Sequence, residues 1–140
     1  MRDPSETRFR VRYAETDQMG VVYYANYLVW MEIGRVELCK SLGFNYRDME
    51  RDDGIYLAVA DVACRYRAPA RFDDEITVKT WLEDANKRLV VFAYEIRTGD
   101  RVLATGSTRH VFVSRQLERT RLPDKYYPLF GISPERLVTS

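Results

Sequence analysis

The stretch ANYLVWMEIGRVELCKSLG, residues 25–43, contains the longest helical pattern in the chain. Apolar side chains recur at the spacing of helix turns from about Tyr23 onward, and they form a wide stripe: Tyr27, Trp30, Met31, Gly34, Leu38, Cys39 and Leu42. Gly43 provides a C-terminal stop. The pattern predicts one long helix over about residues 23–42 with a broad buried face.

The segments on either side of this helix alternate as strands do. A short strand is expected before it, and an irregular segment at 44–53 separates it from longer apolar runs. The predicted strands are 9–13, 55–67, 75–83, 89–97 and 102–114, with a hairpin turn at 98–100 and a less regular tail from about 117. One helix followed by antiparallel strands predicts an α+β fold. No linker divides the 140 residues, so one domain over 1–140 is expected.

Charge and apolar content exclude several classes of protein. Lys and Arg number 22 against 21 Asp and Glu, which disfavours a dedicated nucleic-acid binder. The longest uncharged run, Gln18 to Met31, is too short to cross a bilayer, so no membrane span is expected. The charged N-terminus lacks a signal-peptide core, which predicts a cytoplasmic protein.

Cysteine and histidine usage also limits the possible sites. Cys39 and Cys64 lie in apolar surroundings without a CxxC pair, so we expect reduced thiols. His110 is the only histidine, within a predicted strand, and a structural role is expected for it. We therefore expect no metal site.

The residues with chemical potential lie just before the long helix. Asp17 and Gly20 occupy a polar loop, and the first helical turn after it is aromatic and uncharged. The free N–H groups at a helix start could hold a carbonyl oxygen as it gains charge, and a nearby carboxylate could act as nucleophile or general base. Asp17 could equally be a helix cap, and the residue types alone favour the cap.

Two blocks of sequence resemble a known family. The run YAETDQMGVVYYANYL at 13–28, followed by Glu32 and Arg35, is similar to the signature of hotdog-fold acyl-CoA thioesterases of the 4-hydroxybenzoyl-CoA thioesterase-like family. The block YRAPARFDDE at 66–75 resembles that family's second recurring block. The resemblance covers roughly residues 8–115. It implies a hotdog fold, an antiparallel sheet wrapped around one long central helix, and hydrolysis of the thioester of an acyl-coenzyme A.

The resemblance also implies roles for individual residues. Asp17 takes the catalytic position, as nucleophile or general base, and the backbone N–H of Tyr24 takes the carbonyl-polarising position; this reverses the preference for a cap. Many family members carry histidine where this chain has Tyr24, and a phenol is a poor base near neutral pH. Tyr23 is expected in the core. The candidates for substrate binding are Met19, Gly20, Val21, Glu32 and Val59, and those for coenzyme A binding are Lys87 and Arg88.

Several of these residues have a structural alternative. Glu32 could contact a polar acyl end or pair with Arg35, and the pair is favoured because a carboxylate in an apolar stripe requires a partner. Lys87 and Arg88 could be a solvated hairpin tip. Arg115, Arg119 and Arg121 form a second basic cluster in the tail, with weaker support.

Assembly and substrate also have alternatives. Because one helix covers only part of such a sheet, we expect at least a homodimer. The resemblance implies active sites at the interface of paired protomers, and we expect a homotetramer. No cofactor is expected, because coenzyme A is part of the substrate. The alternative functions are a thioesterase acting on acyl carrier protein and a non-catalytic hotdog acyl-binding module. A hotdog dehydratase would need a histidine-plus-acid pattern that is not evident here.

Overall fold

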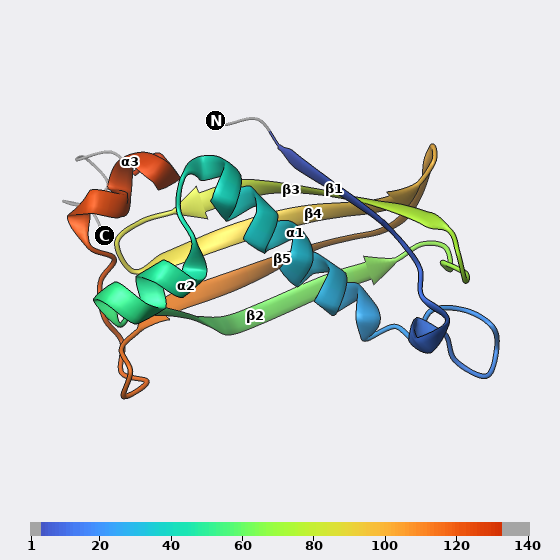
Figure 1. Cartoon of the computed structure of the whole chain (residues 1–140), viewed down its shortest axis with the longest axis horizontal. Helices are drawn as coiled ribbons and strands as arrows, with labels where there is room; N and C mark the ends of the chain where they lie inside the picture. Colours follow the sequence, from blue (N-terminus) through green and yellow to red (C-terminus); the bar gives the residue numbers. More distant parts are fainter. Residues whose placement is uncertain (1–3, 133–140) are drawn as a thin grey trace.

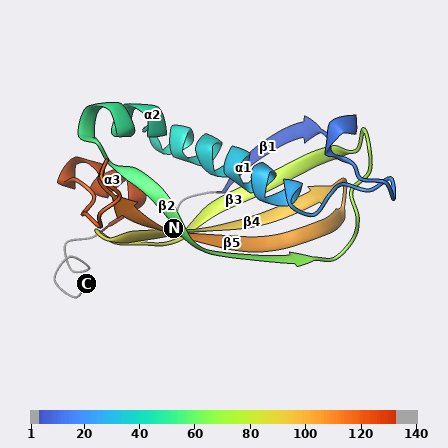
Figure 2. The same cartoon turned by 90° about the horizontal axis from the view of Figure 1, so that it is seen from below.

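The computed structural model describes residues 4–132, in which five antiparallel strands form one sheet in the order β1-β3-β4-β5-β2. The strands are β1 (Ser5–Arg10), β2 (Tyr56–Tyr66), β3 (Glu75–Ala85), β4 (Leu89–Thr98) and β5 (Arg101–Val113). The long helix α1 (Asn26–Leu42) lies diagonally across one face (Figure 1), and the sheet curves around it (Figure 2). This arrangement confirms the predicted α+β hotdog fold.

The core lies between α1 and the concave face of the sheet. Trp30, Met31 and Leu38 of α1 are buried against apolar side chains of the central strands, which include Ile76, Val78, Val90, Phe92 and Ile96. Gly34 allows the closest approach, because a Cβ there would collide with the side chains of Thr80 and Val78. The helix packs over β1, β3 and β4, so the side of the sheet that carries β2 is left uncovered.

The first strand and the helix start differ from the prediction. The strand covers Ser5–Arg10 instead of 9–13, because a 3-10 turn at Tyr13–Glu15 bends the chain, with the Glu15 carboxylate accepting from the Arg12 N–H at 2.8 Å. The helix begins at Asn26 instead of 23. Residues 23–25 form a tight turn whose hydrogen bonds span three residues, such as Asn26 N–H to Tyr23 O at 2.9 Å.

The remaining strands match the prediction to within a few residues. The segment predicted as irregular is partly helical: it contains α2 (Tyr46–Asp48) and a π-helical turn, η2 (Met49–Asp53). Asn45 caps α2 by accepting the Arg47 N–H at 2.8 Å. The tail continues into η3 (Asp124–Tyr126) and α3 (Tyr127–Phe130), which pack against Phe44 beside the C-terminal end of α1 (Figure 1).

The two ends of the sheet carry different connections. The loop before α1 lies at one end, and the hairpin between β3 and β4 lies at the other (Figure 1). The helices within residues 4–132 are too short or too polar to cross a membrane.

Candidate active site

Asp17 lies in a tight hairpin formed by residues 16–22. Its N–H donates to the Val21 carbonyl at 2.8 Å, and its Oδ1 accepts the N–H groups of Met19 at 2.8 Å and Val21 at 3.4 Å. Gly20 completes the turn at a φ of +80°, which favours glycine. The other oxygen, Oδ2, has no hydrogen bond within the described part of the chain. Asp17 therefore closes its own loop and keeps one oxygen available.

The start of α1 is not capped by Asp17 or by any other side chain. The N-cap residue is Ala25, and it makes no side-chain hydrogen bond to the helix. The alternative in which Asp17 is a helix cap is therefore wrong. The reason is the Tyr23–Ala25 turn, which separates the Asp17 loop from the first helical residue.

The backbone N–H of Tyr24 is free at this helix start. Of the N–H groups around it, Tyr23 N–H donates to Glu15 O at 2.9 Å and Asn26 N–H donates to Tyr23 O, whereas the Ala25 N–H also has no acceptor among residues 4–132. Among residues 4–132, no acceptor takes the Tyr24 N–H. A free N–H at the positive end of a helix can stabilise a developing oxyanion.

Tyrosine side chains surround this N–H. Tyr23 and Tyr24 are 48% and 60% exposed, so the expectation that Tyr23 belongs to the core is wrong; it turns outward and contacts the Tyr24 ring instead. The Tyr66 hydroxyl, from the end of β2, donates to the Tyr24 carbonyl at 3.0 Å. Beside Tyr24 lies a cavity of about 310 Å³ that Tyr27, Tyr66 and Arg67 also line. The hydrogen bond with Tyr24 raises the pKa of Tyr23, so this phenol stays protonated at neutral pH.

Three of the predicted substrate-binding residues lie beside Asp17 and two do not. Met19, Gly20 and Val21 belong to the Asp17 hairpin, and Met19 is 82% exposed. Val59 lies on β2, seven residues before Tyr66 and therefore roughly 23 Å along the strand from it. Glu32 lies on the exposed side of α1.

The expected ion pair between Glu32 and Arg35 is not formed within the described chain. The guanidinium of Arg35 points into the core, where its Nη1 donates to the Tyr94 hydroxyl at 3.1 Å. Glu32 stays exposed at the rim of a cavity of about 150 Å³ that Arg35 also lines. The Glu32 side chain is exposed to water there, so its position does not require a salt bridge.

Lys87 and Arg88 occupy the turn between β3 and β4. The Asn86 side chain shapes this turn by accepting the N–H groups of Arg88 at 2.8 Å and Leu89 at 3.0 Å. Arg88 lines a hollow of about 130 Å³ together with Arg109 and Arg119. Arg119 is therefore the member of the tail cluster that joins the predicted cations, whereas Arg115 donates to the carbonyls of Glu50 and Arg51.

The Asp17 hairpin and this basic turn lie far apart within one protomer. The 11 residues of β3 separate the two ends, which corresponds to roughly 35 Å. The pantetheine arm of coenzyme A has 13 bonds from sulfur to phosphorus, about as many as four residues of extended chain, so it spans about 15 Å. The distance from the thioester sulfur to the first phosphate is therefore less than half of the separation between the two ends within one protomer.

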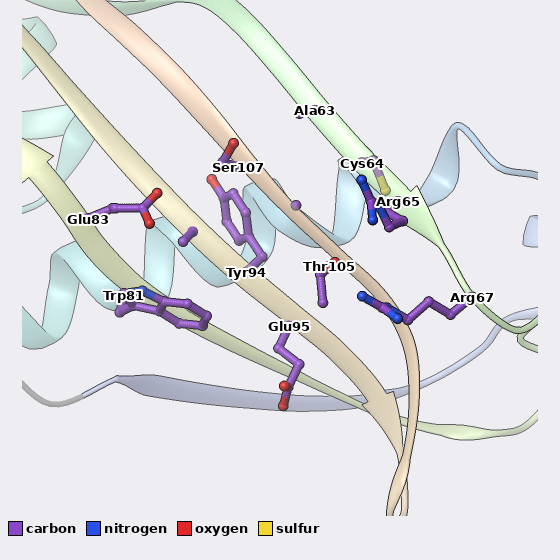
Figure 3. A pocket seen from close by; sticks show the side chains of 12 residues that line it. Ala63, Cys64, Arg65, Arg67, Trp81, Glu83, Tyr94, Glu95, Thr105 and Ser107 are labelled. Carbon is purple, nitrogen blue, oxygen red and sulfur yellow. The ribbon is translucent and has the colours of Figure 1, made fainter.

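Two further features lie outside this region. The outer face of the sheet has a hollow of about 550 Å³ lined by Arg65, Trp81, Glu83 and Glu95, and it contains none of the predicted site residues (Figure 3). His110 is 1% exposed, and burial followed by the charge of Arg35 lowers its pKa to about 3. No group of metal-ligating side chains occurs within residues 4–132.

Comparisons with known proteins agree with this geometry. Residues 11–128 match the family described as the thioesterase-like superfamily. The chain is 44% identical over 113 residues to "Putative acyl-CoA thioesterase YneP" of Bacillus subtilis (strain 168), a match that covers 80% of this chain and 81% of that protein.

Solved structures agree as well. A DHNA-CoA thioesterase from Staphylococcus aureus superimposes with a TM-score of 0.84 at 36% identity, over 91% of this chain and 86% of that one. A 4-hydroxybenzoyl-CoA thioesterase superimposes with a TM-score of 0.83 over 91% and 99%; at 18% identity it supports the fold alone. The sequence match, the relatives and the sheet around α1 together place this chain in the thioesterase-like superfamily, as a hotdog-fold thioester hydrolase.

Proposed function

We propose that the chain hydrolyses acyl-coenzyme A thioesters, with Asp17 as the catalytic carboxylate and the Tyr24 N–H as the donor to the carbonyl oxygen. The observation that carries the proposal is the free Tyr24 N–H at the start of α1, next to a hairpin in which Asp17 keeps one oxygen available. The named relatives support the acyl-CoA substrate class.

The proposed reaction uses two groups of the site: the Tyr24 N–H and the Asp17 carboxylate. As the thioester carbonyl is attacked, its oxygen becomes negative, and the Tyr24 N–H with the helix dipole stabilises that charge. Asp17 either attacks the carbonyl carbon, giving a mixed anhydride and the coenzyme A thiolate, or removes a proton from an attacking water. In the first route water then hydrolyses the anhydride, which releases the acid and restores the Asp17 carboxylate, while the thiolate takes up a proton. Either route ends with a free acid and coenzyme A.

A second copy of the chain completes the site in this proposal. The β2 strand is a free edge, with Val59 and Val62 55% and 46% exposed, and an unpaired edge of this length requires cover. The adjoining side of α1 exposes Leu28, Val29 and Ile33. Two-fold antiparallel pairing of β2 edges would bring each Asp17 end beside the partner's basic end.

This dimer would bring the two predicted subsites, which lie far apart within one protomer, to the same coenzyme A. In it, the thioester lies at Asp17 of one protomer, while the Arg88 and Arg119 hollow of the other protomer faces the nucleotide phosphates. Arginine suits phosphate contacts because its donors form a planar fork. The homotetramer and the cytoplasmic location stay predictions.

Thiol release from acyl-coenzyme A tests the proposal. We expect hydrolysis of at least one member of a panel of short-chain, long-chain and aromatic acyl-CoAs, and a loss of about 10²-fold to 10⁴-fold in kcat for Asp17→Asn. Asparagine can still accept the Met19 N–H, so the hairpin should persist. Asp100→Asn, in the exposed turn between β4 and β5, is the matched control and should keep full activity.

Two outcomes would contradict the proposal. One is full turnover by Asp17→Asn. The other is a wild-type protein that hydrolyses no acyl-CoA in the panel. Hydrolysis of an acylated carrier protein alone would favour the carrier-protein alternative.

A further inference from the structure

Glu15 is a buried carboxylate that the proposed chemistry does not use. Its side chain belongs to the 3-10 turn before the Asp17 hairpin, and the residue is only 5% exposed. A buried carboxylate is costly unless hydrogen bonds satisfy it. The position of Glu15 therefore requires an explanation from its contacts.

Both oxygens of the Glu15 carboxylate accept hydrogen bonds. Oε1 accepts the Arg12 N–H at 2.8 Å, and Oε2 accepts the indole Nε1–H of Trp30, also at 2.8 Å. The Arg12 guanidinium lies 3.5 Å from Oε2. Burial tends to raise the pKa of Glu15, but the bonds from Arg12 and Trp30 outweigh it and lower that pKa.

The indole partner fixes Glu15 to the centre of the fold. Trp30 is fully buried in the N-terminal part of α1, with its ring against Phe9 of β1 at 5.5 Å and Tyr27 at 4.9 Å between centroids. Its Nε1–H is donated to a residue 15 positions earlier in the chain. The Glu15–Trp30 bond thus joins the loop region to the buried core.

The backbone of Glu15 holds the entry to α1. Its carbonyl accepts the Tyr23 N–H and the Asn26 Nδ2–H, both at 2.9 Å. Tyr23 directly precedes Tyr24, whose N–H is free, and Glu15 lies two residues before Asp17. Glu15 therefore connects three parts of the structure: the hairpin that carries Asp17, the turn that carries the Tyr24 N–H, and the core.

We infer that Glu15 is a positioning residue, which through Trp30 holds the Asp17 hairpin and the Tyr24 N–H in a fixed mutual orientation. The inference rests on the proposed function. Glu15 faces into the protein and touches no reacting atom, so its loss should lower the rate of the chemical step more than substrate binding. A misplacement of about 1 Å in a catalytic group can cost about 10²-fold in rate.

Substitutions from both sides of the bond test the inference. Glu15→Gln replaces one acceptor oxygen by an amide, which leaves a buried donor of Arg12 or Trp30 unpaired. Trp30→Phe removes the indole donor and keeps the carboxylate. We expect each substitution to lower kcat by about 10-fold to 10²-fold with less than about a threefold change in KM. The kcat of the double variant should be no lower than that of the less active single variant, because both substitutions remove the same bond.

Matched controls separate positioning from general damage. Trp81→Phe removes the other tryptophan, on the outer face of the sheet, and Glu37→Gln changes an exposed carboxylate of α1; both should leave kcat unchanged. In Glu15→Gln the indole Nε1–H resonance of Trp30 should shift, and the amide of Tyr23 should exchange with solvent at least about tenfold faster.

These measurements test the role of Glu15 separately from the catalytic role proposed for Asp17. Unchanged kcat and unchanged Tyr23 exchange in folded Glu15→Gln would overturn it, as would a fall in kcat that only follows a lowered Tm. If Glu15→Gln does not fold, Trp30→Phe decides by the same measurements. If the wild-type protein hydrolyses no acyl-CoA, the proposed function fails. The exchange rate of the Tyr23 amide in Glu15→Gln then decides by itself whether Glu15 holds the Asp17 hairpin and the Tyr24 turn together.

Discussion

The two ends of α1 are built in opposite ways. At its N-terminal end, Ala25 gives no side-chain cap, the Tyr24 N–H is free, and large aromatic side chains are exposed. At its C-terminal end, Gly43 adopts a left-handed conformation, and its N–H donates to the carbonyls of Cys39 and Lys40. The first end leaves polar groups available to a ligand, whereas the second satisfies its own.

The packing around the two ends follows the same difference. Beside the C-terminal end, Phe44, Tyr126 and Phe130 form a buried aromatic cluster that ties the tail to the domain. Beside the N-terminal end, Tyr23, Tyr24 and Tyr66 contact one another but remain about half exposed. We infer that the N-terminal end of α1, called the open end below, binds the substrate, and that the C-terminal end, called the closed end, supports stability. Substitutions at the open end should therefore change kcat, and those at the closed end should change the free energy of unfolding.

Among substitutions that compare the two ends of α1, the largest effect is expected from removing the free N–H itself. Tyr24→Pro deletes this donor, and proline is favoured at the second position of a four-residue turn, which Tyr24 occupies in the turn from Tyr23 to Asn26. Because the N–H stabilises the oxyanion, kcat for acyl-CoA hydrolysis should fall by about 10²-fold to 10³-fold. Tyr24→Ala keeps the N–H and should retain most of kcat. Equal losses of kcat in the two variants would show that the phenol of Tyr24, and not its backbone N–H, stabilises the oxyanion.

An intermediate effect on stability is expected from His110, which lies towards the closed end. Its pKa is lowered to about 3 in the fold, so between pH 6.5 and 3 the unfolded chain binds a proton that the folded chain does not. The free energy of unfolding should therefore fall by up to about 1.4 kcal/mol for each pH unit as the pH drops below 6.5. Denaturant unfolding of wild type and His110→Gln at pH 7 and pH 5 measures this, and the variant should be less sensitive to acid.

The smallest effect is expected at the C-terminal end of α1. Gly43 has a φ of +104°, where any other residue is strained, so Gly43→Ala should lower the free energy of unfolding by about 1 kcal/mol. Its kcat should equal that of wild type, because the closed end does not touch the substrate. A loss of kcat without a loss of stability would show that the two ends are not separate in function.

The sequence predicted the strands from β2 to β5 well, because alternation and turn residues mark them locally. It misplaced the first strand because Val11 and Tyr13 continue the alternation, but the chain bends where Glu15 bonds to Arg12 and to Trp30. That bend depends on a partner 15 residues away, which no local pattern contains. The sequence misplaced the helix start because residues 23–25 form a separate turn before Asn26.

The candidate site was predictable only in part. Asp17 and Tyr24 are close in sequence, so their shared hairpin and helix start could be expected. The separation of Asp17 from Arg88, and the approach of Arg119 to Arg88, depend on the strand order β1-β3-β4-β5-β2 and on the path of the tail. Val59 lies on the exposed β2 strand and Glu32 on the exposed side of α1, so in the proposed dimer their roles depend on the partner protomer.

Mixed dimers test most directly the claim that the site combines the Asp17 end of one protomer with the basic end of another. The two parent proteins are Asp17→Asn and the double variant Arg88→Glu/Arg119→Glu, and each alone should have strongly reduced kcat/KM. Randomly mixed in equal amounts, they should recover about a quarter of wild-type activity, since half of the dimers then hold one intact site of two. No recovery after verified mixing would place the carboxylate and the cations in the same protomer and contradict the account.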